Sequence, residues 1–150
     1  MIQLTYENPI GVVLNETEWA FPLAECFHIV GFGIAIGTVA LVDLRLLGVG
    51  LKQQTAAYLL KQTWMWTLFA LVVVIFSGFL IFLTDPQLYL YNESFRFKLT
   101  MLALAILYNY TIHRKAATAG YSGIYAQLVG GVSLAMWLSI VAAGLFIAFV

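Results

Sequence analysis

Four long apolar segments, at about residues 21–48, 64–84, 94–113 and 127–150, take up most of this 150-residue chain. About 20 residues of α-helix cross a hydrocarbon core that is roughly 30 Å thick, so each segment is long enough to span a membrane. The composition agrees, because hydrophobic residues make up 63% of the chain and charged residues only 9%, whereas a soluble domain carries about 25% charged residues. We therefore expect one all-α integral membrane domain, residues 1–150, folded as a bundle of four transmembrane helices.

The basic residues are distributed unevenly between the two sides of the expected bundle. Arg96 and Lys98 lie on one side among acidic residues, and the other Lys and Arg residues belong to the two connections on the opposite side. Basic residues accumulate on the cytoplasmic side of membrane proteins. Both termini are therefore expected on the non-cytoplasmic side of a multi-pass protein in a bacterial inner membrane. The basic residues that define the cytoplasmic side are Arg45, Lys52, Lys61, Arg114 and Lys115.

Charge and cysteine content exclude several classes of function. The formal net charge is zero, and the chain contains no basic stripe and no glycine-rich phosphate loop, so nucleic-acid or nucleotide binding has no support. Cys26 is the only cysteine, which excludes a disulfide within the chain and a CxxC redox pair.

His28 is one of only two histidines, and it falls within the first apolar segment. An ionisable side chain is costly in hydrocarbon and is by default a candidate for function. At about 100° per residue, Glu25, His28 and Asp43 share one face of this helix. That face is expected to point into the bundle rather than to lipid.

The third segment also has an inward polar face, which holds Lys98, Asn109 and His113, with Met101 on its flank. This segment runs in the same direction as the first, so distance from the start of each gives a depth in the membrane. At about 1.5 Å per residue, His28 and Met101 lie roughly 10 Å deep, Lys98 roughly 6 Å and His113 roughly 28 Å. Two histidines roughly 18 Å apart cannot both ligate one iron, so a bis-histidine haem within one protomer is not expected.

These depths separate an outer cluster from an inner one. The outer cluster comprises Glu25, His28, Lys98 and Met101. At similar depth lie Ser77 and Gly78 of the second segment and Ala142, Ala143 and Gly144 of the fourth. A histidine next to glycines that leave room suits a porphyrin, with His28 as the ligand of a haem iron. The same pocket could hold a quinone, hydrogen-bonded by His28 and Lys98. A third interpretation is a polar network that satisfies itself and fixes helix register.

The inner cluster comprises Asp43, Asn109 and His113, with Arg45 and Arg114 nearby. Basic residues at an inner interface are what membrane topology requires, and Asp43 is then expected to pair with His113 or Arg114. An inward Asp beside a His also occurs in proton relays. A proton-entry role or a second cofactor is therefore an open alternative for this cluster.

Two stretches of the first segment resemble known membrane families. The run Phe27-His28-Ile29-Val30-Gly31, followed by Asp43-Leu44-Arg45-Leu46-Leu47, resembles the first helix of the membrane-bound, oxygen-independent protoporphyrinogen oxidases and the related copper-resistance D membrane proteins. Most of the chain also resembles a group of uncharacterised bacterial four-helix inner-membrane proteins. Their E-x-x-H and D-L-R-L-L-G signatures are matched here by Glu25, His28 and residues 43–48.

The resemblance implies handling of a b-type haem or a porphyrin. His28 would be the ligand, with Gly31 three residues on, and Arg45 and Lys98 occupy places comparable to an arginine and a lysine of the oxidases. The tryptophan typical of the oxidases' first helix is absent, and their tyrosine–histidine pair reads Tyr108-Asn109 here. The resemblance thus carries over the site and not the oxidase reaction.

Two hypotheses from different classes follow. In the first, the chain is a small cytochrome-b-like electron carrier in the outer leaflet: His28 ligates haem b, Met101 or Lys98 or no residue fills the sixth position, and Glu25 orients the imidazole. Its acidic outer face would then dock a redox partner. In the second, the chain is a cofactor-free accessory subunit of a larger membrane complex or of a homo-oligomer. Any enzymatic activity would be that of a porphyrin- or quinone-linked oxidoreductase. A ridge of small residues in the fourth segment is interpreted first as a face for helix packing, and in the second hypothesis it serves as the docking surface. The ridge consists of Gly131, Ala135, Ser139 and Ala143.

Overall fold

A computed structural model describes residues 8–147, which are helical apart from short connections and contain no strand. The helices follow one another in a simple order along the chain. They are α1 (Pro9–Glu16), α2 (Ala20–Leu46), α3 (Ala56–Thr84), α4 (Pro86–Tyr91), α5 (Glu93–Tyr108), the π-helical turn η1 (Asn109–His113), α6 (Arg114–Thr118) and α7 (Ile124–Phe146).

Short polar side chains begin several of these helices. The Asn8 side chain accepts a hydrogen bond from the Ile10 amide, and Thr55 accepts one from the Tyr58 amide. Asp85 caps α4 and Asn92 caps α5 in the same way. Such caps satisfy amide groups that lack a partner within the first turn, which fixes where each helix starts.

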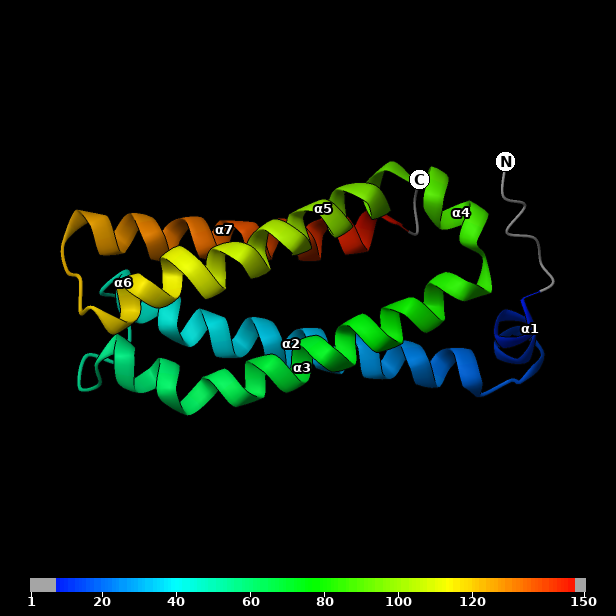
Figure 1. Cartoon of the computed structure of the whole chain (residues 1–150), viewed down its shortest axis with the longest axis horizontal. Helices are drawn as coiled ribbons and strands as arrows, with labels where there is room; N and C mark the ends of the chain where they lie inside the picture. The colour runs from blue at the N-terminus through cyan, green and yellow to red at the C-terminus, as the bar shows by residue number, and fades with distance from the viewer. Residues whose placement is uncertain (1–7, 148–150) are drawn as a thin grey trace.

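The long helices form two antiparallel pairs that lie against each other (Figure 1). One pair is α2 with α3, and the other is α7 with the continuous run of α5, η1 and α6. We call the end with connections 47–55 and 119–123 the loop end, and the end that carries α1 and α4 the α4 end. The α4 end is closed in part by α1, whose Gly11 packs directly on the Leu83 carbonyl at the end of α3.

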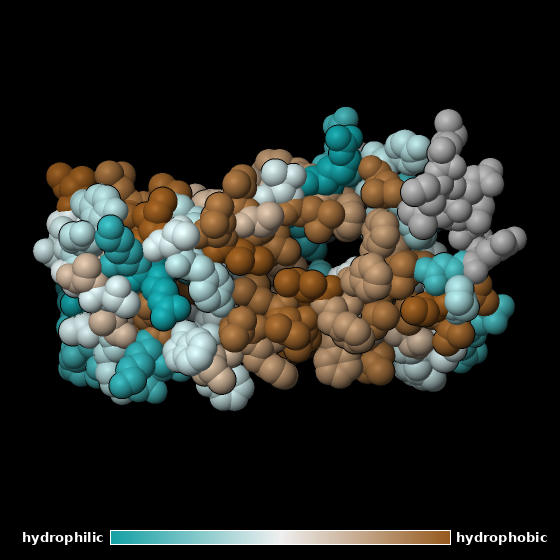
Figure 2. Space-filling model, viewed as in Figure 1, coloured by the Kyte–Doolittle hydropathy of each residue, from teal (hydrophilic) through white to brown (hydrophobic). Residues whose placement is uncertain are grey.

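Apart from Trp137, the bundle core is built from small and medium side chains. At its middle, Ala35 and Val39 of α2 pack with Ala70 of α3 and with Trp137 and Ile140 of α7. Large hydrophobic side chains lie mainly on the outside, and Figure 2 shows them spread across the middle of one face, with hydrophilic residues gathered towards the loop end. An apolar exterior over a small-residue core is the arrangement expected where lipid surrounds the bundle.

Among the described residues 8–147, three helices, not the four predicted, have the length and apolar composition needed to cross a membrane: α2, α3 and α7. The third predicted segment, 94–113, falls short because α5 ends after 16 residues, at Tyr108. From Asn109 the backbone passes into the π-helical turn, which carries the buried polar side chains of Asn109 and His113. Helicity then resumes as α6, so the segment continues beyond its predicted end.

The other predicted boundaries are close, with one exception. The helix predicted at 64–84 begins eight residues earlier, at Ala56, because Thr55 provides a cap that hydropathy does not reveal. The predicted segments 21–48 and 127–150 correspond to α2 and α7. Residues 148–150 of the last prediction lie outside the described part.

The inward face predicted for α2 agrees with the buried residues for most of the helix. The buried face of α7 is rotated by about one residue from the predicted face. Asp43 and Val39 are fully buried and His28 is half-buried, whereas Glu25 is exposed. The buried face of α7 runs through residues next to the predicted small-residue ridge, of which only Ala143 is buried. That face consists of Ala126, Val129, Gly130, Ser133, Trp137, Ile140 and Ala143.

Candidate functional site

The outer cluster forms around the imidazole of His28, which α2 presents to α3 and α5. The ring atom Nδ1 lies 3.1 Å from the Val74 carbonyl oxygen and 3.0 Å from Ser77 Oγ. The other ring nitrogen, Nε2, lies 3.3 Å from Lys98 Nζ. Both nitrogens of an intramembrane imidazole thus have partners, as burial of a polar group requires.

The partners determine which ring nitrogen carries the proton. The Ser77 hydroxyl donates to the Val73 carbonyl at 2.6 Å, so its oxygen is free to accept from His28. A carbonyl oxygen can only accept, and a lysine ammonium can only donate. Nδ1 therefore carries the hydrogen, and Nε2 of a neutral imidazole offers its lone pair towards Lys98.

Aromatic and glycine neighbours complete the cluster. The Phe32 ring packs edge-on against the imidazole, with centroids 5.1 Å apart, and Lys98 Nζ lies 4.8 Å from the centre of the same ring. A Cβ atom added at Gly78 would lie only 2.9 Å from His28 Cε1, whereas one at Gly144 would make an ordinary 3.5 Å contact with Lys98 Nζ. Gly78 is thus required for the imidazole to occupy its place between α2 and α3.

The surface is hollowed near this end of the bundle. Figure 2 shows an opening between α5 and α3, in the half that carries α4. At the loop end, by contrast, α3 is in contact with α6. The two helix pairs therefore separate in the half that contains the His28 cluster.

Only some of the predicted outer residues meet at His28. Lys98 and Gly78 contact the imidazole or its partner, and Met101 instead packs with the central core. Glu25 is exposed, and the contacts of both ring nitrogens are made by other groups.

Two further predicted residues lie away from the imidazole. Gly31 packs on Val74 and Ala70 of α3, and Arg45 lies at the loop end, where it donates to the Gln54 carbonyl.

One contact of His28 was not predicted as part of its site. The Val74 carbonyl carries no sequence signal, since every residue has one. Ser77, by contrast, was predicted in the outer cluster at the depth of His28, and it lies 3.0 Å from Nδ1.

The inner cluster is a buried, hydrogen-bonded pair of side chains rather than an exposed charge group. His113 Nε2 lies 2.6 Å from Asp43 Oδ1, and Ser133 donates to Asp43 Oδ2 at 3.0 Å. The Asp43 and His113 residues are both 0% exposed. Asp43 therefore pairs with His113, one of its two predicted partners, while Arg114 is exposed to solvent or headgroups.

The two clusters are well separated along the bundle. His28 and Asp43 are fifteen positions apart on the continuous helix α2, which corresponds to about 22 Å at 1.5 Å per residue. Because His113 contacts Asp43, the two histidines lie at different depths and cannot ligate one iron.

The residues present suit a haem iron better than a bare metal ion. Within residues 8–147, no group of three or more His, Cys, Asp or Glu side chains could hold a metal ion. A haem iron needs only one or two axial ligands from the protein. His28 can supply one through Nε2.

Comparison with known proteins places the chain in a family without assigning a reaction. No curated protein and no solved structure matches it significantly, and nothing found links it to the protoporphyrinogen oxidases or to the copper-resistance D proteins. One family model matches residues 16–150, which is nearly the whole chain. The chain therefore belongs to the family of unknown function DUF6644.

Proposed function

We propose that this chain is a small cytochrome-b-like membrane protein that binds haem b, or a related porphyrin, with His28 as the axial ligand. The observation that carries the proposal is the hydrogen bond from His28 Nδ1 to the Val74 carbonyl. Histidines that bind metals usually donate their second ring nitrogen to a carbonyl or carboxylate, which fixes the tautomer and leaves the other nitrogen for the metal. His28 is held in that way, and Nε2, which now faces Lys98, would be the ligand atom.

The surroundings of Nε2 fit a flat cofactor once Lys98 moves aside. Lys98 is a flexible side chain that now contacts Nε2, and its ammonium can instead pair with a propionate carboxylate of the porphyrin. Gly78 leaves room beside the imidazole, and the hollow between α3 and α5 gives access from the membrane. When bound, haem would supply one-electron redox chemistry. The protein would position it and exclude water.

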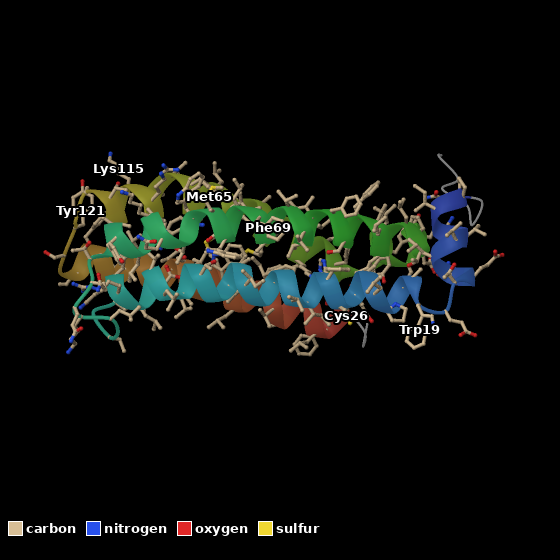
Figure 3. The ribbon with its side chains drawn as sticks, turned by 90° about the horizontal axis from the view of Figure 1, so that it is seen from below. Trp19, Cys26, Met65, Phe69, Lys115 and Tyr121 are labelled. Atoms are coloured by element: carbon tan, nitrogen blue, oxygen red, sulfur yellow. The ribbon has the colours of Figure 1, made fainter. Side chains whose placement is uncertain are left out.

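The proposal includes four membrane crossings rather than three. Residues 93–118 are helical throughout as α5, η1 and α6, and such a run rises roughly 38 Å, enough to cross a bilayer. Figure 3 places Trp19 at one end of the bundle and Lys115 and Tyr121 at the other. With Lys115 on the cytoplasmic side, both termini face outward, which suits a multi-pass protein of a bacterial inner membrane.

A second candidate function is supported by the open face of α2. Cβ atoms added at Gly33 or Gly37 would meet nothing within 4 Å, and small residues let another helix approach closely. In this alternative the chain is a cofactor-free accessory subunit or a homo-oligomer, and the His28 network only fixes helix register. A quinone hydrogen-bonded by Lys98 at the same cluster is the remaining redox alternative.

The absorption spectrum of purified protein tests the haem proposal. Protein from cells grown with ample haem should show a Soret band, and His28→Ala should abolish it. Phe27→Ala is the matched control, because Phe27 is 55% exposed on the lipid-facing side of the same turn. It should keep the band.

Two further variants separate the alternatives. Gly78→Ala should weaken or shift the band by pushing on the imidazole, whereas Gly144→Ala should leave it unchanged. His113→Ala should also retain the band, since His113 lies at another depth. A colourless wild-type preparation would rule out haem and leave the accessory-subunit function, while quinone in its lipid extract, lost in His28→Ala, would favour the quinone site.

A further inference from the structure

A second, separate chamber lies in the half of the bundle near the loop end. It is a cavity of about 200 Å³ between α2, α3, η1 and α6. Its closed end is formed by buried residues, among them Val42, Asn109 and His113. We call it the loop-end chamber. It shares no lining residue with the His28 cluster.

Two polar atoms at the closed end lack partners. Within the described chain, Asn109 Oδ1 and His113 Nδ1 are buried and have no hydrogen-bond partner. Asn109 is 8% exposed and His113 is 0% exposed. Buried polar atoms almost always bond to protein, to water or to a ligand. A partner for these two atoms therefore has to come through the chamber that their residues line.

The Asp43 carboxylate determines what kind of partner is needed. It faces His113 Nε2 at 2.6 Å, so Nε2 carries the hydrogen and donates it. In a neutral imidazole Nδ1 is then an acceptor, as the Asn109 oxygen is. Two acceptors side by side on the π-helical turn call for a hydroxyl group.

The open side of the chamber indicates where such a hydroxyl comes from. Its exposed lining includes the aromatic residues Trp64 and Tyr110 and the cations Lys61 and Arg114. Aromatic rings and basic side chains of this kind mark a membrane interface. A ligand would thus enter from the lipid, and an apolar tail could stay there.

Size and hydrogen bonding select a ring with hydroxyl groups. A cavity of about 150 Å³ can hold one benzene ring, so about 200 Å³ suits a single substituted ring. A phosphate headgroup could reach Lys61 and Arg114, but it offers mainly acceptors and would leave Asn109 and His113 unsatisfied. We propose that the loop-end chamber binds the hydroquinone head group of a membrane quinol, whose hydroxyl donates to His113 Nδ1 or Asn109 Oδ1.

Binding of a short quinol in nanodiscs tests this site. The probes are a hydroquinone with a decyl tail, its oxidised quinone, and its di-O-methyl ether. The hydroquinone should raise the thermal unfolding temperature, because a ligand that binds only the folded state stabilises it. The ether, which has lost both donors, should bind at least about tenfold more weakly. The quinone should also bind more weakly, since it too lacks donors.

Two pairs of variants locate the site. Asn109→Leu should fold and lose the hydroquinone effect, whereas Thr111→Val should keep it. Thr111 is exposed on the same turn and bonds only to backbone carbonyls of its own helix. The quinone form should quench tryptophan emission, and Trp64→Phe should remove most of that quenching. Ala57→Phe, which narrows the chamber from α3, serves as a second loss variant if Asn109→Leu does not fold.

Several outcomes would overturn the quinol site. Equal binding of the hydroquinone and its ether would contradict the quinol site. Undiminished binding of the hydroquinone by both Asn109→Leu and Ala57→Phe would contradict it as well. No stabilisation by any probe would show that the chamber holds only water. Stabilisation by phosphatidylglycerol alone would show a lipid headgroup site. His28→Ala should leave all of these measurements unchanged, so the quinol site and the haem site succeed or fail separately.

Discussion

At the residue scale, the two histidines illustrate two ways of keeping an imidazole in a membrane. His28 bonds to a carbonyl, a hydroxyl and an ammonium from two other helices. His113 has one strong partner, Asp43, and one ring nitrogen without any in the described chain. The first arrangement suits a ring nitrogen, Nε2, that could bind a cofactor once Lys98 moves aside. The second holds α2 to the π-helical turn through a buried hydrogen bond.

The buried pair makes a prediction about stability. Removing one member leaves a buried carboxylate or a buried ring N–H without its partner, so Asp43→Ala and His113→Ala should each destabilise the fold by about 3 kcal/mol. The double variant should lose clearly less free energy of unfolding than the sum of the two single variants, because it leaves no buried polar group without a partner. Unfolding by sodium dodecyl sulfate in mixed micelles measures the difference. Additive effects would show that the two side chains do not interact.

The residues of both clusters could be predicted from the sequence more accurately than the contacts that these residues make. Helical phase and depth placed His28 near Lys98, and Asp43 near His113, because both depend only on regular helix geometry. Glu25 was predicted to face the bundle interior, but it is exposed in the second turn of α2. The Val74 carbonyl could not be predicted, because backbone acceptors look alike in every sequence.

At the element scale, the contact between α7 and α2 depends on a single glycine. A Cβ added at Gly130 would lie 2.8 Å from the Asp43 carbonyl oxygen, so the two helices can lie this close only because Gly130 has no side chain. The small residues of α7 that recur every four positions favoured a packing ridge that begins at Gly131. The buried face instead includes the large side chains of Trp137 and Ile140, so a search for small residues alone could not find it.

Neighbouring substitutions on α7 test this contact. Gly130→Ala should force α7 from α2 and destabilise the bundle by about 1 to 3 kcal/mol, the usual cost of overpacking. Gly131→Ala is the matched control, because its nearest neighbour would be Leu47 Cδ2 at 3.8 Å. Thermal unfolding in detergent should show a loss for Gly130→Ala alone. Equal effects at the two positions would contradict the observed phase of α7.

At the scale of the whole molecule, the two helix pairs open at one end and close at the other. The fold class and three of the four long helices followed from hydropathy, because length and composition alone decide whether a helix can span a membrane. The interruption of the third segment did not follow. A π-helical turn arises from tertiary packing of Asn109 and His113, not from the local apolar pattern.

Cysteine labelling tests whether that interrupted segment crosses the membrane. In a Cys26→Ala background, single cysteines at Glu18 and Gln87 lie at the α4 end, and single cysteines at Gln53 and Ser122 lie in the connections at the loop end; all four positions are exposed. An impermeant maleimide added to intact cells should label the first two, because basic residues hold the loop end in the cytoplasm. It should reach Gln53 and Ser122 only after permeabilisation. Labelling of Gln87 and Ser122 from the same side would show that residues 93–118 do not cross, and a fully reversed pattern would invert the proposed orientation. Either result would move His28 relative to the outer surface, where the proposed redox partner has to dock.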